Sequence, residues 1–153
     1  MLDIYHAPGF LGTSANFAAD ATMLVMVTTA ILFSIGFYLA RKGKFTTHKW
    51  VQTIGALLNV IMVLWMMILP FRDFIIQDKG GPREGFFYGV TALHALTGLS
   101  ATVFGIFVVL RGHGLMPKFL GFNNYKPYMR IAFGLYMGAT LLGITVYMVW
   151  FIF

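Results

Sequence analysis

Residues 86–110 read FFYGVTALHALTGLSATVFGIFVVL, an apolar stretch that contains one histidine, His94, and no Asp, Glu, Lys or Arg. The stretch is longer than the ~20 residues that an α-helix needs to cross about 30 Å of hydrocarbon. At helical spacing, His94 shares one face with small residues, among them Gly98, Ala101 and Gly105. We therefore expect this face to meet neighbouring helices and the larger apolar residues to meet lipid.

Three further apolar segments cover about residues 15–40, 49–71 and 128–153. The chain of 153 residues is 59% hydrophobic and 10% charged, whereas soluble domains carry about 25% charged residues. The separators are rich in turn residues, and no alternating ten-residue runs point to a β-barrel. The sequence thus predicts an all-α protein whose single domain, residues 1–153, is an integral membrane four-helix bundle.

The basic residues orient this bundle. Two of the three connections hold eight basic residues and no acidic one: Arg41, Lys42, Lys44, Lys49, Arg111, Lys118, Lys126 and Arg130. The remaining connection mixes both signs of charge, and the N-terminal segment has no Lys or Arg. By the positive-inside rule, both termini should lie on the outer, periplasmic side. This distribution accounts for the net charge of +6, so no nucleic-acid partner is expected.

His94 is the first candidate for a functional site, because an ionisable residue in a membrane helix is costly and is a functional hypothesis by default. Asn59 and Tyr88 fall at compatible depths, so the three residues form a candidate pocket for b-type haem or a quinone. A bis-histidine haem site is not expected, since the other histidines lie at the opposite interface or on connections: His6, His48 and His113. The chain has no cysteine and no HExxH motif, and we predict neither catalytic residues nor a metal site.

Other polar residues have a structural interpretation. Asn59 is expected to join helices by a hydrogen bond. Asp20 falls in the first turns of a helix capped by Thr13 or Ser14, where the helix dipole favours a carboxylate; pairing with His94 is the less favoured alternative. The motif Gly134-x-x-x-Gly138 predicts a close-packing face on the last helix.

Several short motifs occur in a suggestive order. They are Arg41-x-Gly-x-x-x-x-His48, Arg72, Gly80-Gly81-Pro82, Tyr88, His94 and Thr145-Val146-Tyr147. Together, over about residues 35–150, the chain resembles domain-of-unknown-function family 420. These are small four-helix bacterial membrane proteins, some of which take part in the maturation of haem-containing cytochrome oxidase. The family tends to have a further histidine before the last helix, where this chain has Asn123-Asn124-Tyr125.

The resemblance implies a bacterial cytoplasmic (inner) membrane protein with several spans. Our leading hypothesis is a non-catalytic accessory subunit or assembly factor of a respiratory or photosynthetic electron-transfer complex. Its partners would be the subunits of that complex and the lipid bilayer, with bound phospholipid expected and no redox cofactor predicted. The alternative is a redox membrane protein that binds haem or quinone near His94.

Overall fold

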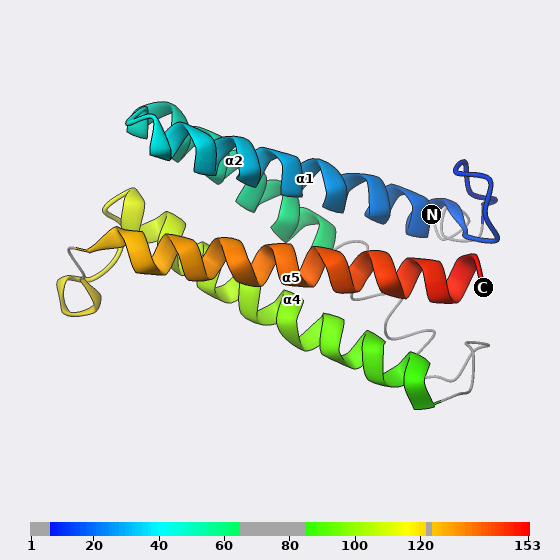
Figure 1. Ribbon diagram of the computed structural model, residues 1–153. Coiled ribbons are helices and arrows are strands. Elements are labelled where there is room, and N and C mark those ends of the chain that lie inside the picture. Colours follow the sequence, from blue (N-terminus) through cyan, green and yellow to red (C-terminus); the bar gives the residue numbers. More distant parts are fainter. Residues whose placement is uncertain (1–6, 65–84, 122–123) are drawn as a thin grey trace.

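The computed structural model describes residues 7–64, 85–121 and 124–153, and these residues form an all-α fold (Figure 1). Its four helices are α1 (Phe17–Arg41), α2 (Phe45–Met62), α4 (Gly85–Gly112) and α5 (Tyr125–Phe151). A short 3-10 turn, η4 (Lys118–Leu120), lies between α4 and α5. The predicted extension of the second helix to residue 71 falls outside the described residues.

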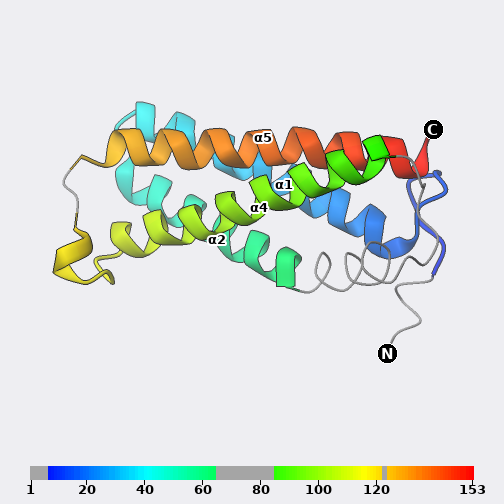
Figure 2. The ribbon, with the colours of Figure 1, turned by 90° about the horizontal axis from the view of Figure 1, so that it is seen from below.

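The helices alternate in direction and close into a ring. α1 packs chiefly on α2, and α4 packs chiefly on α5, while smaller contacts join α1 to α5 and α2 to α4. The turn after α1 and the connection before α5 lie at one end of the molecule (Figures 1 and 2). The loop of residues 7–16 and the C-terminal end of α5 lie at the other end. We call the first end the basic end, because Arg41, Lys42, Lys126 and Arg130 lie there.

Three helices, α1, α4 and α5, are long and apolar enough to cross a membrane. They contain 25, 28 and 27 residues, so each is longer than about 30 Å of hydrocarbon at ~1.5 Å per residue. Large apolar side chains cover their outer faces; Leu96, for example, is 65% exposed. A soluble protein seldom exposes so much contiguous apolar surface. The length and apolar surface of these helices support a membrane-embedded protein.

The centre of the bundle is small and contains an aromatic pair. Ala30 of α1, Ala101 of α4 and Tyr136 of α5 form the buried cluster. Phe33 packs beside them, and its ring meets that of Tyr136 edge-on at 4.5 Å between centroids. The two alanines leave room for these rings between helices, so one aromatic pair fills the middle of the bundle.

The start of α1 differs from the sequence prediction. Asn16, not Thr13 or Ser14, caps the helix, with its side-chain oxygen accepting from the Ala19 amide at 2.9 Å. Thr13 and Ser14 instead tie the preceding loop to α5. The Thr13 hydroxyl lies 2.8 Å from the Tyr147 hydroxyl, and the Ser14 hydroxyl donates to the Phe151 carbonyl at 2.8 Å. The loop and the C-terminal end of α5 are therefore one packed unit.

Candidate functional site

His94 lies at the contact between α4 and α5 and is half-buried. Its Nδ1 is 2.9 Å from the carbonyl oxygen of Ala139. A carbonyl can only accept, so Nδ1 carries the proton and Nε2 keeps its lone pair. Gly143 lies beside the ring: a Cβ there would be 2.8 Å from His94 Cε1 and 2.6 Å from the sulfur of Met26. His94 and Met26 thus come together over Gly143.

Asn59 and Tyr88 do not share this position. Asn59 is buried and donates from Nδ2 to the Thr102 hydroxyl at 2.9 Å, which is the expected bond between helices. Thr102 lies eight residues beyond His94 on α4, roughly 12 Å away along the axis. Tyr88 lies six residues before His94, roughly 9 Å away. The three candidate residues are therefore spaced apart along α4 and α2 and do not line one pocket.

Asp20 is fully buried at the end of the bundle opposite the basic end. Its carboxylate accepts from the backbone amides of Phe10 and Leu11 at 2.6 and 2.7 Å, and from the Tyr147 hydroxyl at 2.5 Å. The carboxylate therefore joins the loop of residues 7–16 to α1 and α5. Its position in the first turn of α1 agrees with the prediction; the suggested pairing with His94 does not occur, because the loop and Tyr147 occupy both oxygens.

Two polar side chains of α2 bond to the backbone of α1. His48 Nδ1 lies 2.7 Å from the Gly36 carbonyl oxygen, and Gln52 donates to the Phe33 carbonyl at 3.3 Å. His48 is only 7% exposed, so its ring lies between helices, and its position at the membrane interface stays a prediction. A Cβ on Gly36 would press on the Gln52 side chain, so the missing side chain at Gly36 makes room for Gln52.

His113 also differs from the solvent-exposed residue that its loop position suggested. Its Nε2 lies 2.8 Å from the Thr53 hydroxyl, and its ring meets Trp50 edge-on at 5.7 Å. These contacts fix the end of α4 to α2. At the other end of α4, the Trp150 indole donates to the Thr91 hydroxyl at 3.2 Å, which joins α4 to α5.

The small residues that were predicted to lie at helix contacts differ in their surroundings. Ala101 is buried in the core. At the four predicted glycines, an added Cβ would meet no described atom within 4 Å: Gly98, Gly105, Gly134 and Gly138. Close approaches occur instead at Gly36 against Gln52, at Gly55 against Phe33, and at Gly143. The glycine pattern in the sequence therefore did not show which small-residue face contacts another helix of this chain.

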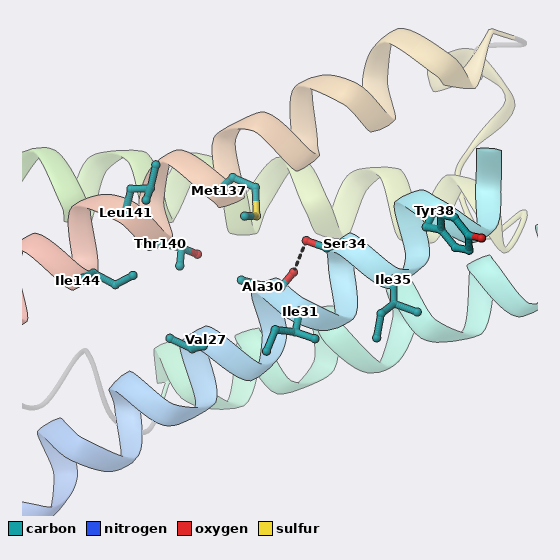
Figure 3. Close-up of a pocket in the computed structure, with 10 residues that line it drawn as sticks. All are labelled: Val27, Ala30, Ile31, Ser34, Ile35, Tyr38, Met137, Thr140, Leu141 and Ile144. Atoms are coloured by element: carbon teal, nitrogen blue, oxygen red, sulfur yellow. Dashed lines mark hydrogen bonds between the residues drawn. The ribbon is translucent and has the colours of Figure 1, made fainter. Parts of the chain in front are cut away.

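A groove of about 510 Å³ runs between α1 and α5 on the outside of the bundle (Figure 3). Residues 27–38 of α1 form one wall and residues 137–144 of α5 form the other. We call it the α1/α5 groove. It is lined by none of His94, Asn59 and Tyr88. Sequence analysis did not identify it, because a groove between the first and last helices depends on which helices become neighbours.

Some described polar side chains join separate parts of the chain, and many hydroxyl groups bond to the backbone of their own helix. Within residues 7–64, 85–121 and 124–153, no three His, Asp or Glu side chains gather in a way that could hold a metal ion. The His94 imidazole bonds to α5 through Nδ1, and the Met26 side chain comes near the same ring at Gly143. An imidazole nitrogen and a thioether are both groups that can bind a transition metal.

Comparison with known proteins finds no counterpart: no family model, no curated protein and no solved structure matches the chain.

Proposed function

We propose that this protein is a non-catalytic accessory subunit or assembly factor of a bacterial electron-transfer complex in the cytoplasmic membrane. One observation carries the proposal. Three buried polar side chains, Asp20, His48 and Asn59, bond to the chain itself. Meanwhile large apolar faces and the α1/α5 groove stay uncovered. A bundle of this kind is suited to packing against other membrane proteins.

The motif resemblance to domain-of-unknown-function family 420 supports the choice of partner. Several of its residues lie at contacts within the bundle. His48 holds α2 to α1, His94 holds α4 to α5, and Tyr147 holds the loop of residues 7–16 through Asp20. If these residues maintain the bundle, the resemblance concerns a shared scaffold, and the outer faces provide the contacts with an oxidase or a related complex.

The test is purification of the tagged full chain from its native membrane in a mild detergent. Subunits of an electron-transfer complex should copurify, and mass spectrometry would identify them. Recovery of the chain without any electron-transfer subunit, under conditions that keep known complexes intact, would contradict the proposal.

A matched pair of variants sharpens this test. Gly138 is on a small face where the chain leaves open space, so Gly138→Leu should leave the isolated bundle intact and disturb a partner that packs there. We expect partner recovery to fall roughly tenfold, as a loss of about 1.4 kcal/mol gives. The control is Leu96→Ile on the exposed face of α4, which conserves volume and apolar character.

The second candidate function is a redox protein with haem or quinone near His94. The observation that favours it is the protonated Nδ1 of His94, which is held by the Ala139 carbonyl as metal-bound histidines are commonly held. Met26 lies beside the ring and offers a thioether. An absorbance scan of the purified protein, with His94→Ala as control, tests for haem by its Soret band; solvent extraction and chromatography test for quinone.

A further inference from the structure

We propose that the α1/α5 groove binds one acyl chain of an anionic glycerophospholipid, with the lipid phosphate held at the basic end between Lys42 of α1 and Arg130 of α5. The inference does not depend on the partner complex proposed above. It follows from the length of the groove, the state of its hydroxyl groups and the charges at one of its ends.

The length of the groove matches one leaflet. It runs along α1 from Val27 to Tyr38, which are eleven residue steps apart or roughly 17 Å at ~1.5 Å per residue. That is about half of the ~30 Å hydrocarbon core. Since Tyr38 is near the basic end of α1, the groove extends from that surface to about the middle of the membrane. An acyl chain whose headgroup lies at this surface extends over the same range of depth.

The walls of the groove are suited to an apolar occupant. Side chains such as Ile31, Met137 and Leu141 line it (Figure 3). Three of its residues carry hydroxyl groups. Ser34 donates to the Ala30 carbonyl at 2.8 Å and Thr140 donates to the Tyr136 carbonyl at 2.9 Å, whereas Tyr38 lies at the mouth of the groove. A quinone carbonyl inside the groove requires a hydrogen-bond donor, and the Ser34 and Thr140 protons are already donated. Beyond its mouth, the chemistry of the walls thus favours a hydrocarbon chain over a quinone ring.

The basic end supplies the complementary charge. Phe37 and Phe133 stack at 5.0 Å between centroids and bring α1 and α5 together at this level. Arg130 is exposed seven residues before Met137, on the groove side of α5 by helical spacing. The Lys42 ammonium lies 5.5 Å from the centre of the Tyr38 ring, at the mouth of the groove. Asp20, the one acidic residue in the described ranges, lies at the far end of α1, so nothing described there neutralises these cations.

The experiment measures lipid retention by the full chain. The protein is reconstituted in nanodiscs that contain equal amounts of phosphatidylglycerol and phosphatidylcholine, released into mild detergent, and analysed by native mass spectrometry. We expect one phosphatidylglycerol to be retained per chain in clear excess over phosphatidylcholine. Lys42→Gln and Arg130→Gln should each lower that retention roughly fivefold. The charge-matched control, Lys49→Gln on α2, should leave it unchanged.

A second pair of variants tests the groove itself. Ser34→Phe fills it without removing a bond between helices and should abolish retention. Ser100→Phe is the control, because Ser100 is also exposed and its hydroxyl also bonds to its own helix, at the Leu96 carbonyl at 2.8 Å. If Ser34→Phe does not fold, phosphatidylglycerol with a photoreactive acyl chain is crosslinked to the wild-type chain. The labelled peptides should then come from residues 27–38 and 137–144.

Three results would overturn the proposal. One is equal retention of the two lipids. Another is a quinone in the extract of the wild-type protein that disappears in Ser34→Phe. The third is photolabelling confined to α2 and α4, which do not line the groove. A groove occupied by a helix of another protein would appear as the third result together with a crosslink from Ser34→Cys to that protein.

Discussion

Asp20 is the residue whose surroundings are most demanding, since three donors converge on one buried carboxylate. Asp20→Asn keeps the shape but replaces one acceptor oxygen with an NH₂ group that would face those donors. We expect a loss of about 1–3 kcal/mol in the free energy of unfolding, together with faster proteolysis within residues 7–16. The unfolding of the detergent-solubilised protein, followed by circular dichroism, measures the first effect, and timed digestion measures the second.

Tyr147→Phe is the matched control for this prediction. It removes one of the three donors and leaves the two backbone amides in place, so its effect should be smaller. If Asp20→Asn unfolds at the same denaturant concentration as the wild type and its loop stays resistant to protease, the carboxylate does not hold the loop.

The Asn59–Thr102 hydrogen bond allows a quantitative test at the same scale. A double-mutant cycle with Asn59→Ala and Thr102→Val isolates the pair energy, which we expect to be about 0.6 kcal/mol, as is usual between membrane helices. Thr28→Val serves as control, because the Thr28 hydroxyl bonds to its own helix at Leu24. A coupling energy of zero for Asn59 and Thr102, or an equal one for Asn59 and Thr28, would contradict the role of this bond.

Individual residues were only partly predictable from sequence. The bond of Asn59 to another helix follows from the cost of an unpaired amide in hydrocarbon, which any fold must avoid. The partners of Asp20 do not follow from the sequence pattern, because two of them are backbone amides of a loop whose path depends on its packing against α5. The same applies to His48, whose acceptor is a backbone carbonyl of α1, at Gly36, that the sequence pattern does not single out.

At the scale of helices, hydropathy predicted where the helices lie, and the local sequence explains where a helix end differs from the prediction. α5 begins at Tyr125, before the residue 128 that the sequence suggested. Pro127 falls in the first turn of the helix, where a missing N–H removes no bond. The helix therefore includes Pro127 and begins two residues before it.

Substitution by alanine should change the stability of the protein in opposite directions at two glycines of α5. In Gly143→Ala the new Cβ would press on Met26 and His94, so we expect a loss of stability. In Gly138→Ala it would meet no described atom within 4 Å, and the better helix propensity of alanine should stabilise the isolated chain by up to about 1 kcal/mol. Unfolding of both variants in the same detergent checks the signs. Equal effects would mean that Gly143 is not at a close helix contact.

At the scale of the whole molecule, the described chain ends and the basic connections lie at opposite ends of the bundle (Figure 2). By the positive-inside rule, we expect the basic end to face the cytoplasm. The native chain has no cysteine, so single cysteines can report the orientation directly. Suitable positions have exposed side chains: Leu11 and Phe153 at one end, and Lys44 and Phe119 at the other.

We expect a membrane-impermeant maleimide to label Leu11→Cys and Phe153→Cys in intact spheroplasts, because both would face the periplasm. Lys44→Cys and Phe119→Cys should be labelled only after the membrane is permeabilised, since the eight basic residues of their connections are expected to keep them in the cytoplasm. Labelling of all four after permeabilisation controls for accessibility. The reverse pattern would place the basic end outside, and the lipid expected in the α1/α5 groove would then belong to the outer leaflet of this membrane.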